Sequence, residues 1–319
     1  MVKNTACCVL AHSGPQRTEK STPQPFASLR PCRTAFLTIL RTNVLQLLTC
    51  VLVLVETAAF AANPYEPTTG PVATEVLVRV VAHGAMVLGD TVGGARVTIT
   101  EVATGTVLAS GLQQGEAGDQ NQTMRTPRMM GEPHYSSRTA ASFRATLQLE
   151  RPTMVEISAR GPMAHPQAVQ RASTTVLLIP GQDPTNDGIV LSLYGFIVQI
   201  EHPKPGAALI ARDDVKLRAS VRTLSGSSVR PHGDWDSRKM TIYGEVLLGE
   251  RVLERIQMFP VGSTGSFEAP FFVPRDTDAP DGMTLRVVAA DRAGGHFGMS
   301  EVRHPILPER LKRTTPEPR

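Results

Sequence analysis

The chain has 319 residues, with 33 Lys plus Arg against 29 Asp plus Glu, and a formal net charge of +4. Six of the basic residues but only two of the acidic ones lie in residues 1–61, so residues 62–319 carry 27 of each and are formally neutral. All four cysteines lie in that first segment: Cys7, Cys8, Cys32 and Cys50. Residues 62–319 therefore exclude a cysteine-ligated metal, a thiol nucleophile and a disulfide framework.

Residues 1–61 resemble an export leader. Basic residues precede the apolar run Val44–Val55, and a small-residue step follows at Ala59-Phe60-Ala61. This order is typical of a signal peptide, and it predicts cleavage after Ala61. The run is shorter than the roughly 20 residues that span a membrane, and Glu56 ends it, which favours export over an uncleaved anchor. We expect the mature protein to be periplasmic or secreted and not membrane-spanning.

The mature chain has the pattern of an all-β protein, with short alternating or β-branched runs between Gly, Pro and Asp turns. The runs in its first half predict seven strands: Thr74–His83, Ala95–Glu101, Thr106–Ser110, Ala141–Leu149, Thr153–Ala159, Ser173–Ile179 and Ile189–Tyr194. Those in its second half predict seven more: Phe196–Glu201, Val215–Arg222, Met240–Leu247, Arg251–Met258, Ser266–Val273, Met283–Ala290 and Gly298–Arg303. Short turns predict hairpins at Ala103-Thr104-Gly105, at Gly249-Glu250 and at DPTND (183–187).

Seven short strands per unit predict two β-sandwiches in tandem. We expect the first sandwich to span 62–194 and the second, an immunoglobulin-like one, to span 195–308. A basic, proline-bearing tail at 309–319 is expected to be disordered. The first sandwich would contain one unusually long connection without regular structure, at 111–139.

Four stretches carry a family resemblance. GARVTITEVATGTVLASG (94–111) resembles transthyretin-like, carboxypeptidase-regulatory-like modules. DDVKLRASV (213–221), GSFEAPFFVP (265–274) and DGMTLRVVAADRAGG (281–295) are similar to bacterial immunoglobulin-like or fibronectin-III-like domains. The first resemblance implies adhesion, scaffold or carrier roles, although such folds carry no single function. The Cys…Trp…Cys framework of true immunoglobulin domains is absent, since Trp235 stands alone.

The 111–139 connection contains most of the candidate metal-ligating and interface residues. Thioether and imidazole groups suit Cu(I), and four side chains could supply them: Met124, Met129, Met130 and His134. The methionines could instead anchor the loop onto the sandwich, because methionine fills irregular gaps well. A third possibility is a partner contact, in which interleaved arginines meet an acidic protein surface. The side chains for that contact are Arg125, Arg128 and Tyr135.

Three shorter loops have alternative interpretations. Gly161–Ala168 holds Met163 and His165, which could join the Met/His cluster or simply lie in a proline-bounded loop. Arg230–Arg238 has an H-x-D-x-D spacing that could bind a divalent metal, and its Trp235 could be an interface residue or a partly buried loop residue. Asp183–Gly188 resembles a calcium loop, but Tyr194 stands where the last acidic ligand belongs, so we predict a turn.

Signatures of catalysis are missing from the sequence. It has no G-x-S-x-G elbow, H-E-x-x-H pair, Walker loop or Rossmann fingerprint. We therefore expect a non-catalytic accessory, scaffold or protein-binding subunit without a cofactor, whose partner is another periplasmic protein. The alternatives are copper handling and carbohydrate or cell-envelope binding, although aromatic residues make up only 5% of the chain. Basic and acidic residues alternate, so nucleic-acid binding is not expected.

Overall fold

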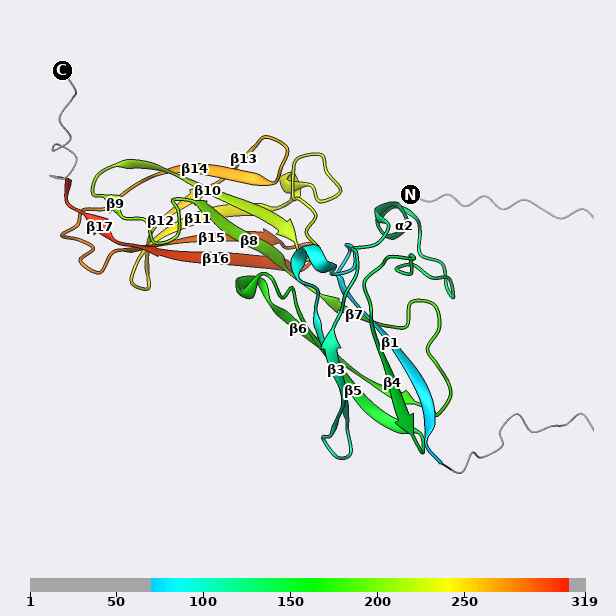
Figure 1. Ribbon diagram of the computed structural model, residues 1–319. Coiled ribbons are helices and arrows are strands. Elements are labelled where there is room, and N and C mark those ends of the chain that lie inside the picture. Colours follow the sequence, from blue (N-terminus) through cyan, green and yellow to red (C-terminus); the bar gives the residue numbers. More distant parts are fainter. Residues whose placement is uncertain (1–69, 310–319) are drawn as a thin grey trace, which may run out of the picture. The chain divides into compact units, whose positions relative to one another are not determined.

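The computed structural model describes residues 70–309, and all of them belong to one compact unit. They form two β-sandwiches, one after the other in the chain (Figure 1), which confirms the predicted all-β fold class. The predicted leader with its cleavage after Ala61 lies outside the described residues, as do 62–69 and the tail from 310 onward.

The first sandwich has the seven strands that the sequence predicts. They are β1 (Val72–Ala82), β2 (Arg96–Glu101), β3 (Val107–Leu112), β4 (Phe143–Leu149), β5 (Thr153–Gly161), β6 (Gln170–Leu178) and β7 (Ile189–Leu193). One sheet has the order β4-β1-β7 and the other β3-β2-β5-β6. Two short 3-10 helices, η2 (Asp90–Val92) and η3 (Pro166–Ala168), lie in its connections.

Alternation along the strands builds the first core. In β5, Val155, Ile157 and Ala159 are buried while Met154 and Arg160 are exposed, because successive side chains point to opposite faces of a sheet. Strand β1 departs from this pattern.

On β1, Leu77 and Arg79 point away from the core valines and are nevertheless buried. Arg79 donates hydrogen bonds to the backbone of residues 186–187 and contacts Ser136, so other segments of the chain cover this face.

The predicted hairpin between Thr175–Pro180 and Gly188–Tyr194 was wrong. Strand β6 pairs with β5, whereas β7 pairs in parallel with β1, from Val78 opposite Ile189 onward. The chain crosses from one sheet to the other between them. Alternation reports which face of a strand is buried but not which strand lies beside it, so the pattern could not distinguish these arrangements. The other two predicted hairpins are confirmed by the β2–β3 and β11–β12 pairings.

The second sandwich contains ten strands instead of seven. They are β8 (Phe196–His202), β9 (Leu209–Ile210), β10 (Asp214–Thr223), β11 (Thr241–Leu248), β12 (Arg251–Gln257), β13 (Phe259–Val261), β14 (Ser266–Phe272), β15 (Met283–Asp291), β16 (His296–His304) and β17 (Ile306–Leu307). Its main sheets have the orders β13-β14-β10-β8 and β12-β11-β15-β16, and β17 pairs with β9. The three unpredicted strands have two or three residues, too few for an alternation to be seen.

The 111–139 loop is more regular than expected. It contains α2 (Gln120–Arg125), whose N-cap Asp119 accepts hydrogen bonds from the backbone N–H groups of Asn121 and Gln122. The helix ends at Thr126 because the residue before a proline is disfavoured in the α conformation. Within residues 70–309 no helix is long and apolar enough to cross a membrane.

Candidate functional site

Buried polar side chains fasten the 111–139 loop near both of its ends. Near its start, the Gln113 amide accepts the Val80 N–H at 2.7 Å and donates to the carbonyls of Val80 and Leu88. Near its far end, the Asp187 carboxylate accepts the backbone N–H groups of His134 at 2.8 Å and Tyr135 at 2.9 Å. The loop is therefore held by hydrogen bonds that give it a defined path.

Arg79 holds the backbone at Asp187 in place by hydrogen bonds. Arg79 is 3% exposed, and its guanidinium donates to the Asp187 carbonyl at 2.8 Å and to the Asn186 carbonyl at 3.2 Å. Burial lowers the pKa of Arg79, and the Asp187 carboxylate opposes that shift. We call Arg79, Asp187 and the backbone of 134–135 the Asp187 clamp. Sequence analysis missed it, because Asp187 was assigned to a turn; a lone arginine within the valine-rich run 76–81 was the available signal.

The predicted copper ligands differ in their exposure. Met124 is half-buried and packs against the first core, whereas Met129 is 62% exposed and Met130 is fully exposed. The His134 Nε2 lies 3.0 Å from the Thr123 carbonyl oxygen, to which it donates. Within residues 70–309 no hydrogen bond joins any of these sulfurs to His134. Gln113 and Asp187, not Met129 and Met130, hold the loop in place.

Two of the predicted interface residues contact each other. The Arg128 guanidinium lies 6.0 Å from the centroid of the Tyr135 ring, and the His134 ring meets Tyr135 edge-on at 4.9 Å. Burial raises the pKa of Tyr135, while the charge of Arg128 acts in the opposite direction. Tyr135 is therefore partly enclosed, and Arg128 lies over it.

Helix α2 contacts the Trp235 loop, which comprises Arg230–Arg238. The Gln120 amide donates to Asp234 Oδ2 at 2.7 Å, and Arg125 pairs with the same oxygen at 3.4 Å. Clefts of about 580 and 300 Å³ adjoin this contact and share Met124, Asp234 and Trp235 in their lining. The structure thus brings together two loops that the sequence had presented separately, and Arg125 is engaged within the chain.

The two aspartates of the H-x-D-x-D spacing have partners within the chain. Asp236 accepts backbone N–H groups of His232 and Arg238 and pairs with the Arg238 guanidinium, which holds the pKa of Asp236 well below its usual range. Asp234 is bound by α2. In the described part of the chain, no group of three or more His, Cys, Asp or Glu residues is placed to hold a metal ion.

Trp235 packs between the two sandwiches. It contacts both hydrophobic cores, and its ring meets Phe196 and His296 edge-on at 5.8 and 5.0 Å. The Gly195 N–H donates to His296 Nδ1 at 3.2 Å. Trp235 is thus half-buried at the junction of the sandwiches, and part of its surface lines the clefts.

The Gly161–Ala168 loop is hydrogen-bonded to the connection between β1 and β2. Its backbone N–H groups at Met163 and Ala164 donate to the carbonyls of Gly94 and Val92. Burial, helped by the charge of Arg222, lowers the pKa of His165. No hydrogen bond or ring contact joins this loop to residues 124–135 among the described residues.

Comparison of the sequence with protein-family models found no match, and comparison with curated proteins found none either. Among solved structures, the chain is similar to fibronectin(III)-like modules of Clostridium thermocellum CbhA, with 11% identity, 70% of this chain and 83% of that chain covered, and a TM-score of 0.27. It is also similar to a chimeric titin Z1Z2-Z1Z2 tandem (11% identity, 74% and 99% covered, TM-score 0.23). A third is a DUF3823 family protein from Bacteroides ovatus (9% identity, 72% and 96% covered, TM-score 0.27).

Proposed function

We propose that the protein is an exported, non-catalytic β-sandwich protein that binds another periplasmic or secreted protein through its 111–139 loop. The observation that carries the proposal is the pairing of anchorage with exposure in this loop. The Asp187 clamp holds residues 134–135, while Met129 and Met130 a few residues earlier are exposed.

Exposed apolar side chains on an ordered segment are typical of a contact surface. Methionine suits that role because its flexible, polarisable side chain adapts to a partner. Anchorage also matters energetically, since a loop that is already ordered loses less conformational entropy on binding. Arg128, beside Tyr135, adds a cation that would favour an acidic rim on the partner.

Several features support a role in binding over one in catalysis. The carboxylates of the Trp235 loop are occupied by Arg125, Gln120 and Arg238. The transthyretin-like resemblance implies adhesion, scaffold or carrier roles. Copper ligation by the loop stays a prediction, as does binding of carbohydrate.

The proposal is tested by photo-cross-linking from position 129 in the cell that produces the protein. We expect one adduct with an extracytoplasmic protein, identified by mass spectrometry. Replacing both Met129 and Met130 by Gln should weaken binding of the identified partner about tenfold or more, because each buried thioether side chain contributes roughly 1–2 kcal/mol.

The matched control is Met299→Gln, which changes a methionine of 51% exposure on β16. A second pair separates the loop's order from its side chains. Asp187→Ala should also weaken binding, whereas Asp183→Ala, which removes a single hydrogen bond to the Glu75 N–H, should not. Equal cross-linking from positions 129 and 299, or undiminished binding by the Gln variant, would contradict the proposal.

A further inference from the structure

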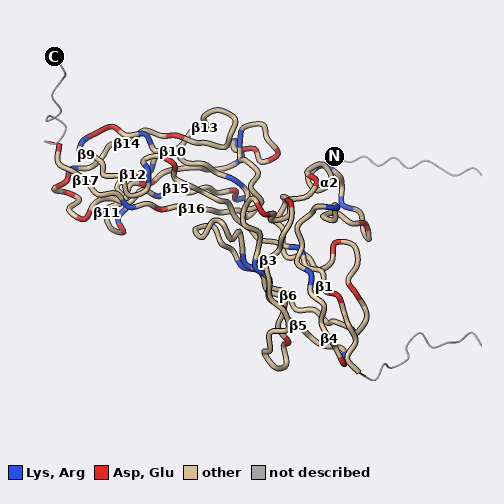
Figure 2. Tube along the Cα trace, viewed as in Figure 1, with Lys and Arg blue, Asp and Glu red and all other residues tan. Residues whose placement is uncertain are grey.

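A row of three arginines crosses the outer face of the four-stranded sheet of the first sandwich. Arg96 on β2 is directly opposite Arg160 on β5, and Arg160 is directly opposite Arg171 on β6. All three are exposed and line a cleft of about 510 Å³ on this face. Figure 2 colours every Lys and Arg blue, and blue segments lie in the region of the tube labelled β3, β5 and β6.

The row has no compensating anion. Within residues 70–309 none of the three guanidiniums takes part in a side-chain hydrogen bond or ion pair. The nearest acidic side chain in the cleft, Glu156, lies four residues along β5 from Arg160. Like charges directly opposite each other on a sheet are unfavourable, since the Cβ atoms of such pairs are only about 5 Å apart.

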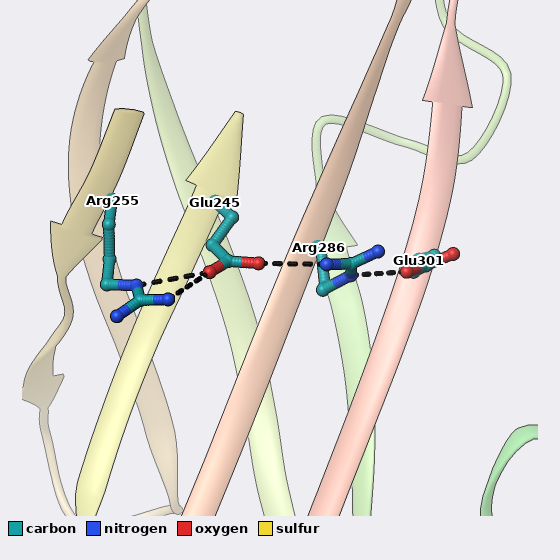
Figure 3. A network of polar contacts seen from close by, with 4 residues as sticks. All are labelled: Glu245, Arg255, Arg286 and Glu301. Carbon is teal, nitrogen blue, oxygen red and sulfur yellow. Dashed lines mark hydrogen bonds and ion pairs between the residues drawn. The ribbon is translucent and has the colours of Figure 1, made fainter. Parts of the chain in front are cut away.

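The second sandwich shows how this chain compensates such a row elsewhere. Across β12, β11, β15 and β16 the side chains in register are Arg255, Glu245, Arg286 and Glu301, and each contacts the next (Figure 3). We call this alternating set the charge ladder. The arginine row has the same cross-strand geometry without the acidic members.

A row of hydroxyl groups lies beside the arginine row. Two residues further along the strands, on the same outer face, Ser110, Thr98, Ser158 and Ser173 are in register on β3, β2, β5 and β6. Thr98 and Ser158 also line the cleft. The face therefore presents three cations and, one row away, groups that both donate and accept hydrogen bonds.

The chemistry of the row favours a phosphoryl group over a carboxylate. Three guanidiniums together present many donors in rigid forks. A phosphate monoester carries close to two negative charges and three terminal acceptor oxygens, enough to meet all three, whereas one carboxylate meets one fork well. The hydroxyl row would then face the polyol to which the phosphoryl group is attached.

We propose that this face binds a phosphorylated sugar, with the phosphoryl group on Arg96, Arg160 and Arg171 and the sugar hydroxyls over Thr98 and Ser158. This site lies on the face of a sheet, whereas the protein contact proposed above lies on the 111–139 loop. The two proposals are independent of each other. In an exported protein it would tie the first sandwich to phosphorylated glycans outside the cytoplasm.

The test is isothermal titration calorimetry of residues 62–319 with four probes: glucose 6-phosphate, inorganic phosphate, glucose and glucuronate. Glucose 6-phosphate should bind at least about tenfold more tightly than inorganic phosphate, and glucose and glucuronate should bind more weakly than either. Equal affinity for glucuronate would overturn the phosphoryl assignment, and equal affinity for inorganic phosphate would overturn the sugar. A poly-glutamate peptide is titrated as a fifth probe, and tighter binding of this peptide than of glucose 6-phosphate would assign the face to acidic proteins and overturn the proposal.

Variants locate the site. Arg160→Gln should weaken glucose 6-phosphate binding about tenfold or more, because it removes the charge-assisted hydrogen bonds of the central guanidinium. The affinity of Arg160→Lys for glucose 6-phosphate should lie between those of the wild type and Arg160→Gln, since lysine keeps the charge but loses the planar fork. The control is Arg251→Gln, an equal change of charge at an exposed residue of β12.

Folding of the variants is checked by thermal unfolding. Phosphate at fixed ionic strength should raise the melting temperature of the wild type and not that of Arg160→Gln. An equal rise in both proteins, or unchanged affinity in Arg160→Gln, would overturn the proposed site.

Discussion

His296 is a buried histidine where the two sandwiches meet. Its Nδ1 accepts the Gly195 N–H, so this nitrogen carries no proton, and its ring lies against Trp235, Phe196 and His83. Burial lowers the pKa of His296, and the neighbouring His83 acts in the same direction, while Asp291 opposes them. The folded protein therefore keeps His296 neutral at pH values where a histidine in the unfolded chain takes up a proton.

This shift predicts a loss of stability in mild acid. As the pH falls below about 6.5, the usual pKa of histidine, the unfolded state binds more protons than the folded state, so the free energy of unfolding decreases until the folded-state pKa is passed. His296→Asn, which keeps an acceptor for the Gly195 N–H but does not titrate, should flatten this decrease. Urea unfolding between pH 7.5 and 5 measures it.

The exposed His202→Asn variant is the matched control and should keep the pH dependence of the wild type. A His296→Asn protein whose stability declines with acid as steeply as the wild type's would contradict the assignment.

At the residue scale, the two unusual loops could be predicted from the sequence, but the hydrogen bonds that hold them could not. The 111–139 and Trp235 loops could be singled out because their length and composition are unusual. Asp187, which holds the first of these loops, could not, because its partners are backbone N–H groups more than fifty residues away. Any residue except proline can supply a backbone N–H group, so a hydrogen bond to the backbone cannot be predicted from the types of residues present.

At the element scale, the charge ladder joins four strands of one sheet. Glu245 is 3% exposed and accepts from Arg255 at 2.8 Å and Arg286 at 3.1 Å, while Arg286 also pairs with Glu301. The buried member is a single carboxylate held by two arginines that reach it from more exposed positions. Removing its charge takes away the acidic partner of Arg255 and one of the two acidic partners of Arg286.

Glu245→Gln should therefore destabilise the second sandwich by about 3 kcal/mol, since breaking a buried ion pair from one side is costly. Glu301→Gln, at the more exposed end of the same ladder, should cost less than about 1 kcal/mol. Chemical denaturation monitored by circular dichroism measures both. Equal losses in the two variants would show that burial of Glu245 does not decide its contribution.

All fourteen predicted strands are found, because each has enough residues for alternation to show a buried face. The failures have a common cause. Strands β9, β13 and β17 are held by their neighbours in the fold, and α2 is a short helix with no buried residue. The pairing of strands could not be predicted for the same reason, since the paired residues of β1 and β7 are more than a hundred positions apart in the sequence.

On the scale of the whole molecule, Trp235 belongs to both hydrophobic cores. Around it, α2 binds Asp234 from the first sandwich, and Phe196 and His296 pack on the ring from the second. We therefore expect the unfolding of one sandwich to depend on the other.

Trp235→Ala should lower stability by about 3 kcal/mol, near the lower end for a lost tryptophan because the side chain is only half-buried. It should also separate unfolding into two transitions in scanning calorimetry, since the sandwiches would lose their shared contact. Trp235→Phe, which keeps much of the apolar contact, is the control and should retain a single transition. A single transition in Trp235→Ala would show that other contacts couple the sandwiches.

The parallel pairing of β1 with β7 has a consequence for the order of assembly. The first strand of the sandwich cannot complete its sheet until the last has been synthesised, so the contact is a late and topologically remote one. Asp187 lies just before β7, and its carboxylate reaches the loop only when that strand is in place. The exposed methionines are thus held in their final arrangement only in a finished sandwich, which ties recognition of a partner to the completion of folding.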